Sequence, residues 1–502
     1  MITFVVSIVL LLLGYFVYSK FIANVIGVDS RRRTPVKKME DGVDYVPMKP
    51  WRIFLIQFLN IAGIGPIIGA VMGAQFGTAS FLWIVLGSIF AGAVHDFVAG
   101  FISVKYKGCS LPEIVGRHLG KGSMLFMRIF TIFLMVLVGA VFVSIPAELL
   151  QGQFTPNWNP YIWVIIIFGY YLLATLLPID KVIGKIYPVF GILLLLMAVF
   201  VVCGFFRPEV HLLELWEGLE NQHPQAATNP IFPMMFISIA CGAISGFHAT
   251  QSPMMARCMT DEKYSRPIFY GAMITEGIVA LIWAAAAAYF FNNVDTQGAA
   301  GAGMVQFIAK SWFTPLLATI TILGVIAAAV TSGDTALRSA RLILADFLGM
   351  DQKPIYKRLL IALPIFLASA GLLIYSNKDE DGFQMIWRYF AWANQVLATI
   401  TLWAVSVFIF NKRFYTDKYR WSFLITLIPA LFMTMVVSSF IFVAQKEGFG
   451  LPRPLAYGIG GAITLLAFLT YFALNDRRLK ARRKQKKQKK ITPHTITKNK
   501  PR

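Results

Sequence analysis

Charged residues are scarce in this chain of 502 residues. They make up 14% of the sequence, whereas about 25% is usual in soluble proteins, and hydrophobic residues make up 57%. Apolar runs of about 18 or more residues recur from end to end, which is typical of membrane-spanning helices. Because these runs use up most of the length, the sequence excludes a large soluble domain.

Motifs of enzyme and metal chemistry are also missing. The four cysteines, Cys109, Cys203, Cys241 and Cys258, show no CxxC spacing and fall in or beside apolar segments, which indicates free buried thiols. The sequence contains no HExxH, no GxSxG and no glycine-rich phosphate loop. We therefore expect a protein that is not an enzyme and that needs no cofactor beyond a coupling ion, Na⁺ or H⁺.

The net charge of +21 is concentrated at the C-terminus. Residues 476–502 hold thirteen Lys and Arg against one Asp and lack apolar periodicity, so we expect a disordered, basic cytoplasmic tail. Beside a membrane helix, such a tail predicts contact with anionic lipid head groups rather than with nucleic acid. A specific partner of the tail is the alternative.

The apolar runs predict an all-α integral membrane protein with about thirteen spans. Loops after odd-numbered spans are rich in Lys and Arg, as at Arg31–Arg33, and the even loops are not. This places the N-terminus outside and the C-terminus in the cytoplasm. Residues 1–475 would form one transporter domain, with 1–50 as an extra helix and loop, 51–411 as the core, and 412–475 as two extra helices. The predicted spans are 3–21, 52–75, 79–104, 124–146, 160–178, 182–206, 230–250, 268–291, 313–333, 357–375, 384–411, 420–444 and 454–475.

Two stretches between spans are expected to be helical. Ser110 and Glu113 have the spacing of a capping box, with Pro112 inside the first turn, so a short helix should begin there. Residues 335–349 are rich in Ala, Leu and Arg and should continue the ninth span as far as Gly349.

Two of the spans are expected to be broken. Gly63, Gly65, Pro66 and Gly69 interrupt the second span, and residues 238–253 combine glycines and a proline with polar side chains. Unpaired backbone cannot face lipid, so each break must be buried or line a cavity. Two broken helices of opposite direction, five spans apart, predict the inverted five-plus-five repeat in which transporters hold substrate and ions. Two continuous, glycine-rich packing helices are the alternative.

The end of a half-helix offers unpaired N–H groups and a partial positive charge, which suit a carboxylate. We therefore expect an anionic organic substrate between the two breaks. The candidate substrate-binding residues are Ala62, Gly63, Ile64, Gly65 and Pro66 in the first break and Ser245, Gly246, His248 and Gln251 in the second.

A third polar segment lies in the ninth span and is a candidate ion site. The carbonyl of Ala328, the hydroxyls of Thr331 and Ser332 and the carboxylate of Asp334 could form an oxygen cage facing the first broken helix. The alternative is that the hydroxyls bond back to their own helix. A lysine reaching the cage, Lys185, would replace Na⁺ and favour proton coupling, unless it extends to the membrane surface instead.

Buried ionisable groups supply candidates for proton movement. His95 and Asp96 near the inner end of the third span could relay protons, since imidazole titrates near neutral pH. Neighbours in sequence point to different helix faces, so the two need not touch, and hydrogen bonding within the bundle is the alternative. Glu148 and Glu276 are weaker candidates, and Asn394 and Gln395 are expected to brace neighbouring helices.

Six stretches of the chain, in order along most of its length, match a known family when they are taken together. They are Asp41–Pro47, Ile61–Gly69, Gly92–Phe97, Ala240–His248, Asp334–Arg341 and Ala393–Ala398. With these stretches the chain resembles the carbon starvation protein A family of bacterial membrane transporters. The resemblance implies a leucine-transporter-type fold in the bacterial inner membrane and uptake of pyruvate or peptides during carbon limitation. At 57–58 the chain has Gln57 and Phe58 where the family is expected to have a His pair.

The predicted function is secondary active import of a small carboxylate such as pyruvate, or of short peptides, driven by H⁺ or Na⁺ symport. The alternative from another class is a membrane sensor or assembly protein that binds a metabolite without moving it, and a channel is a further option. The sequence leaves the oligomeric state open.

Overall fold

The structure is a computed structural model that describes residues 1–42, 44–159, 161–177, 179–296, 298–376, 382–412 and 421–491. Side chains are described for these residues except 179–186, 412 and 477–491. The described residues form helices and connecting loops, and their β-structure is limited to one isolated bridge between Met48 and Met259. The predicted all-α class is therefore confirmed.

Ten of the described helical segments are long and apolar enough to cross a membrane. An eleventh is a bent pair, α4 (Pro50–Ile61) with the segment Gly65–Ala74. The short apolar helix α10 (Tyr161–Leu176) and the interrupted segment Ile231–Cys258 occupy the positions of the predicted fifth and seventh spans. The ten are Ile2–Ile26, Ala79–Lys105, Lys121–Phe154, Tyr187–Gly204, Glu262–Asn293, Pro315–Leu348, Ile355–Ser376, Gly382–Asn411, Leu424–Val443 and Arg453–Asp476.

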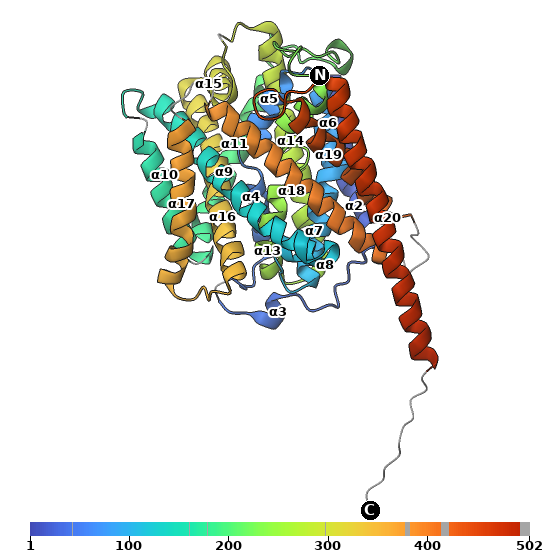
Figure 1. Ribbon diagram of the computed structural model, residues 1–502. Coiled ribbons are helices and arrows are strands. Elements are labelled where there is room, and N and C mark those ends of the chain that lie inside the picture. The colour runs from blue at the N-terminus through green and yellow to red at the C-terminus, as the bar shows by residue number, and fades with distance from the viewer. Residues whose placement is uncertain are drawn as a thin grey trace, which may run out of the picture.

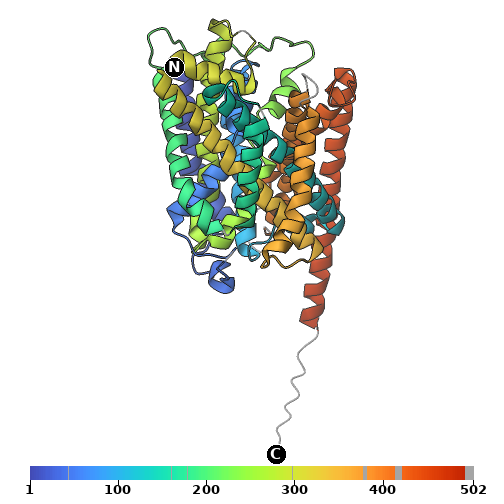
Figure 2. The same ribbon diagram turned by 90° about the vertical axis from the view of Figure 1, so that its left-hand side faces the viewer.

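The helices stand side by side as a bundle (Figures 1 and 2). The chain begins at one end of the bundle, and α20 (Arg453–Ile491) runs along its flank and extends beyond the opposite end, where α3 (Val36–Met39) also lies. The N-terminus and the end of α20 at Ile491 therefore lie at opposite ends of the bundle, as an odd number of spans requires.

Both of the helical stretches expected between spans are present. The helix α8 (Leu111–Leu119) begins after Ser110 with the predicted capping box to Glu113. The ninth span, α16 (Pro315–Leu348), continues to Gly349, which ends it in the left-handed conformation at φ 64°. At the C-terminus the structure differs from the prediction, because α20 stays helical to Ile491 where a disordered tail was expected from 476. Lys, Arg and Gln are good helix formers, so they extend a helix that the membrane span has already nucleated. Residues 492–502 lie outside the described part of the chain.

The first break separates α4 from the π-helical turn η2 (Gly65–Gly69) and α5 (Ala70–Ala74), and the two parts are bent by 52°. Ala62 leaves the helix at φ −75°, ψ 53°. Pro66 has no backbone N–H, so it cannot donate a hydrogen bond to a carbonyl oxygen of the helix before it.

The second break is longer. The π-helical turn η5 (Ile231–Met235) and α12 (Phe236–Ser238) end at Ile239, and α13 (Gly246–Cys258) begins only after Ser245. Residues 239–245 are not helical. The prediction of two interrupted helices is thus confirmed, and the alternative of two continuous packing helices is wrong.

Candidate functional site

At the first break one backbone carbonyl lacks its helical hydrogen-bond partner, and two hydroxyl groups of α16 lie within hydrogen-bond distance of it. Gly63 N–H donates to Ile61 rather than to Leu59, so the carbonyl of Leu59 has lost its helical partner. The hydroxyls of Thr331 and Ser332 lie 3.0 and 3.2 Å from this carbonyl oxygen. Gly63 permits the approach, because a Cβ at this position would lie 2.5 Å from the Ser332 hydroxyl.

The predicted ion site is therefore partly assembled. The Thr331 hydroxyl also lies 3.1 Å from the carbonyl of Ala328, so four oxygens, from Leu59, Ala328, Thr331 and Ser332, converge. Thr331 also lies 3.0 Å from the Ala327 carbonyl, which is the back-bonding expected of a hydroxyl in its own helix. The sequence had pointed to the first broken helix for carbonyls but had not identified Leu59.

Asp334 lies on the same helix but faces different partners. Its two carboxylate oxygens accept hydrogen bonds from the hydroxyls of Tyr170, at 3.0 Å, and Tyr187, at 2.9 Å. The Tyr187 hydroxyl also lies 3.0 Å from the carbonyl of Thr331. Asp334 is thus connected to the oxygen cluster through a tyrosine and does not itself contact the Leu59 carbonyl. The side chain of Lys185 lies outside the described part of the chain.

The second break is braced by two amides of α18 (Gly382–Lys412). Asn394 accepts a hydrogen bond from the N–H of Phe247 at 2.7 Å, which caps the start of α13. Gln395 donates to the carbonyls of Ala240, at 2.9 Å, and Ile244, at 3.2 Å. The expected bracing role of both amides is confirmed. The cap also means that an amide occupies the half-helix end that the sequence had assigned to a substrate carboxylate.

The two breaks touch each other. A Cβ on Gly65 would lie 2.3 Å from Cys241 Sγ, and a Cβ on Gly69 would lie 2.8 Å from the carbonyl oxygen of Ser238. Only glycine allows the two backbones to come this close. The structure therefore brings together the two segments that the sequence had singled out separately.

Four buried ionisable side chains form a chain beside the second break. Asp96 Oδ1 lies 2.7 Å from His95 Nδ1, and Asp96 Oδ2 lies 2.9 Å from His248 Nδ1. The other ring nitrogen of His248 lies 3.3 Å from Glu276 Oε2. All four side chains are 0% exposed. His95 and Asp96, which as sequence neighbours need not touch, are in contact, and Glu276, one of the two weaker candidates, is the far end of the same chain. The other weaker candidate, Glu148, lies on the helix Lys121–Phe154 and is not one of the four.

This cluster joins three elements, α7 (Ala93–Lys105), α13 and α14 (Ala272–Asn293). His248 stands between two carboxyl groups and contacts one with each ring nitrogen, so the imidazole can accept a proton on one side and release it on the other. The contact between His248 and Asp96 is a hydrogen bond, whereas His248 Nε2 and Glu276 Oε2 form no hydrogen bond at 3.3 Å and must approach each other for the second step. The arrangement can therefore pass a proton between Asp96 and Glu276 without water.

Three buried amides have side-chain atoms without a partner in the described part of the chain, two on α4 just before the first break and one on α13. Gln57 and Asn60, on the last turns of α4, are 0% exposed, and all four of their amide atoms lack a hydrogen-bond partner among the described residues. On α13, Gln251 donates to the Thr250 hydroxyl at 2.9 Å, but its Oε1 has no such partner. Buried amides are normally paired, so these atoms are available to a polar ligand. The sequence had marked Gln57 only as a departure from the resembling family.

A cavity of about 210 Å³ lies beside α5 of the first broken helix and α12 of the second. Its walls include Met72 and Gln75 from the first broken helix and Ser238 from the second. Arg388 reaches the wall and pairs with Glu447 at 3.0 Å. Burial and the nearby charge of Arg388 hold the pKa of the His223 imidazole below its usual value, so this wall residue is neutral at pH 7. The cavity is polar, small and adjacent to the breaks.

The structure thus groups the predicted site residues differently from the sequence. Ala62, Gly63, Ile64, Gly65 and Pro66 are buried at the first break. Residues of the second break, all buried as well, divide among three roles: Ser245 and Gly246 contact Asn394, His248 joins the acidic chain, and Gln251 keeps an unpaired oxygen.

An all-helical bundle with two touching, interrupted spans and buried acid–base groups beside them defines a membrane transporter of the leucine-transporter-type fold. Two solved structures share this fold. A manganese transporter from Eremococcus coleocola matches with a TM-score of 0.60 at 13% identity over 88% of this chain and 99% of that one. MhsT, solved with L-phenylalanine, matches with a TM-score of 0.55 at 13% identity over 85% and 99%.

The chain belongs to the family described as carbon starvation protein CstA, whose model matches residues 1–156, 148–311 and 293–439. An uncharacterized membrane protein of Haemophilus influenzae is 41% identical over 60% of this chain and 95% of its own length. The peptide transporter CstA of Bacillus subtilis is 28% identical over 94% and 95%. The pyruvate/proton symporter BtsT of Escherichia coli is 28% identical over 59% of this chain and 50% of its own length.

Proposed function

We propose that this protein imports a small carboxylate, pyruvate or a short peptide, by symport with protons. It would lie in the bacterial inner membrane with its N-terminus outside and its C-terminus in the cytoplasm, as the distribution of Lys and Arg among the loops favours. The names of the family relatives, a peptide transporter and a pyruvate/proton symporter, support this substrate class.

The substrate would bind at the first break. The support is the set of unpaired, buried amide atoms of Gln57 and Asn60 on α4 and of Gln251 on α13, two helices that pack against each other. Amide N–H groups can donate to a carboxylate, and the amide oxygens can accept from the N–H of a peptide. The polar cavity on the outer side would admit the substrate, with Arg388 as its cation.

The single observation that favours protons over Na⁺ is the buried chain His95–Asp96–His248–Glu276. Its groups change charge by gaining or losing protons, and none of them is exposed. By contrast, the hydroxyls of Thr331 and Ser332 can satisfy the Leu59 carbonyl as donors, so this cluster needs no cation to pair its freed backbone oxygen.

Uptake into proteoliposomes tests the proposal. Labelled pyruvate, a labelled dipeptide and a labelled amino acid would be offered under an inward pH gradient, with Na⁺ replaced by choline. We expect accumulation of pyruvate or the dipeptide above equilibrium. Glu276→Gln should abolish proton-driven accumulation but retain exchange of substrate across the membrane, because the chain loses its end group while the amides at the first break are unchanged.

The matched control is Glu220→Gln, which makes the same chemical change on an exposed loop and should leave uptake as in the wild type. Binding of labelled substrate without accumulation under any gradient would indicate a sensor and contradict transport. Uptake that stops at equilibrium would indicate a channel. Accumulation that requires Na⁺ and ignores the pH gradient would refute proton coupling.

A further inference from the structure

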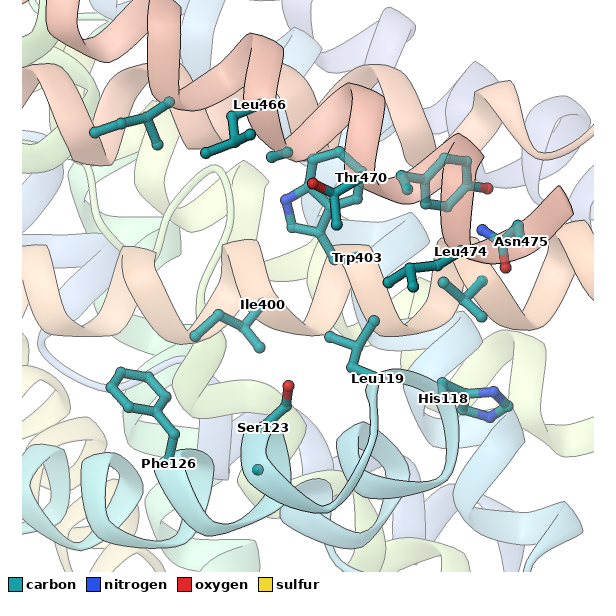
Figure 3. Close-up of a pocket in the computed structure, with 15 residues that line it drawn as sticks. His118, Leu119, Ser123, Phe126, Ile400, Trp403, Leu466, Thr470, Leu474 and Asn475 are labelled. Atoms are coloured by element: carbon teal, nitrogen blue, oxygen red, sulfur yellow. The ribbon is translucent and has the colours of Figure 1, made fainter. Parts of the chain in front are cut away.

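A large apolar groove lies on the flank of the bundle, away from both breaks. It has a volume of about 680 Å³, in the range of known ligand pockets. Its walls come from α8, the start of α9 (Lys121–Phe154), α18 and α20. Figure 3 shows Phe126, Ile400 and Leu466 at one end and His118 and Asn475 at the other. The groove is therefore apolar over most of its length and polar at one end.

The polar end contains an amide with no partner. Asn475 is 1% exposed, and neither its Nδ2 nor its Oδ1 has a hydrogen-bond partner among the described residues. Two other polar groups in the wall are paired: the Trp403 N–H donates to Thr434, and the Tyr471 hydroxyl lies 3.0 Å from Ser406. The unpaired amide consequently needs a ligand that can both accept and donate a hydrogen bond.

The depth of Asn475 identifies the kind of ligand. The apolar part of α20 runs from Arg453 to Asp476, 24 residues, or about 36 Å of helix. A bilayer has a hydrocarbon core of about 30 Å. Asn475, at the end of this stretch, thus reaches the level of the lipid head groups, and the apolar wall extends from there along the acyl chains.

Basic residues are more numerous than acidic ones in the segments that meet at this end, where Asp476 is the acidic neighbour of Asn475. Lys121 begins α9 beside the groove, and the exposed guanidinium of Arg117 on α8 lies over the Tyr106 ring at 4.9 Å. In the sequence, Arg477 and Arg478 follow Asn475 by two and three positions, and α20 continues through them. A cationic rim at head-group level attracts anionic lipids.

We propose that this groove binds one anionic phospholipid, with an acyl chain against Ile400, Trp403 and Leu466 and its head group at Asn475. A phosphate oxygen would accept from Asn475 Nδ2, and a head-group hydroxyl, such as those of phosphatidylglycerol, would donate to Oδ1. The site does not depend on the transport function proposed above, since it lies on a different face and its test measures lipid rather than uptake.

Native mass spectrometry of the purified, delipidated protein tests the site. With phosphatidylglycerol or phosphatidylcholine added at equal concentration, we expect phosphatidylglycerol to be retained at least fivefold more. Asn475→Leu should reduce this preference to less than twofold while leaving the lipid-free melting temperature unchanged or higher, because leucine removes the unpaired amide. A purely structural role of Asn475 would instead lower the lipid-free melting temperature.

A second pair of variants keeps the test independent of Asn475. Gly122 lines the groove, and a Cβ there would meet nothing within 4 Å, so Gly122→Leu should narrow the groove and lower retention of both lipids. Gly169→Leu, on exposed α10 with equal space, should leave retention unchanged. Equal retention of the two lipids by the wild type, or an unchanged preference in Gly122→Leu and Asn475→Leu, would overturn the proposal. If the mass spectra show a dimer that persists when phosphatidylglycerol is added, the groove would hold a second copy of the chain rather than a lipid.

Discussion

The contact between the two broken helices makes a prediction with a definite sign. In an ordinary helical position, replacing glycine by alanine stabilises a protein by up to about 1 kcal/mol. At Gly65 the new Cβ would lie 2.3 Å from Sγ and 2.4 Å from Cβ of Cys241, where ordinary contacts begin at 3.4 Å. The helices must separate by about 1 Å, and overpacking of this kind costs about 1–3 kcal/mol. Gly65→Ala should therefore lower the melting temperature and reduce uptake.

The partner residue allows a double-mutant cycle that isolates this contact. Cys241→Ala keeps the Cβ at 2.4 Å, so it should not rescue Gly65→Ala. Cys241→Gly leaves only the Cα, at 3.8 Å, an ordinary contact, so it should rescue. We expect a coupling of about 1–3 kcal/mol between Gly65→Ala and Cys241→Gly and little coupling with Cys241→Ala. Thermal unfolding in detergent, followed by fluorescence, measures each variant.

Gly371→Ala on α17 (Ile355–Ser376) is the control, since its Cβ would meet nothing within 4 Å and the substitution should be neutral or slightly stabilising. Additive effects of Gly65→Ala and Cys241→Gly, or rescue by Cys241→Ala as complete as by Cys241→Gly, would refute the packing of the breaks described above.

Three further predictions concern single contacts. Ser332→Ala should lower stability by about 0.5–1 kcal/mol, because Thr331 still donates to Leu59, and should retain proton-driven uptake; a loss of uptake that high Na⁺ restores would indicate a sodium site instead. Asn394→Leu should cost about 1–3 kcal/mol in thermal stability, since the Phe247 N–H loses its buried partner while the Ala240 carbonyl keeps Gln395; stability equal to that of the wild type would contradict the bracing role. Glu214→Gln should make the melting temperature depend less on pH in the acid range. Burial raises the pKa of Glu214, but its hydrogen bonds with the N-terminal ammonium group, Thr3 and Ile2 outweigh this effect and lower the pKa to about 2. The carboxylate thus stabilises the fold above about pH 4.5, and this contribution is lost as the pH falls towards 2; an unchanged pH profile in the variant would exclude this contribution.

The breaks could be predicted from the sequence because their cause is local. Proline lacks an N–H, and clustered glycines weaken a helix wherever it packs, so Pro66 and its neighbours indicate a break without any knowledge of the fold. The capping box at Ser110 and the end of the ninth span at Gly349 are local in the same sense, and both are confirmed.

The partners of the site residues could not be predicted, because they depend on distances between spans. Asp96 and His248 are 152 positions apart, and Thr331 and Leu59 are 272 apart. Nothing in the local sequence around Ser245 indicates that Asn394 would form hydrogen bonds at the start of α13. Whether the amides of Gln57 and Asn60 find hydrogen-bond partners also depends on the residues that surround them. The sequence shows only that these two polar side chains lie within an apolar span.

The contacts divide the site into two parts that would behave differently during transport. The proton chain lies on α7, α13 and α14: α7 packs on both α13 and α14, and these two helices also pack on α4. The hydroxyls of Thr331 and Ser332 lie on α16, which packs chiefly on α9 and α11 (Ile179–Gly204). If one group of helices rocks against the other, as in transporters built from inverted repeats, the acid–base chain moves as a unit and keeps its hydrogen bonds. The contact between Leu59 and α16 crosses the two groups and must change. Glu276→Gln therefore acts on the driving proton, and Ser332→Ala acts on the equilibrium between inward-facing and outward-facing forms.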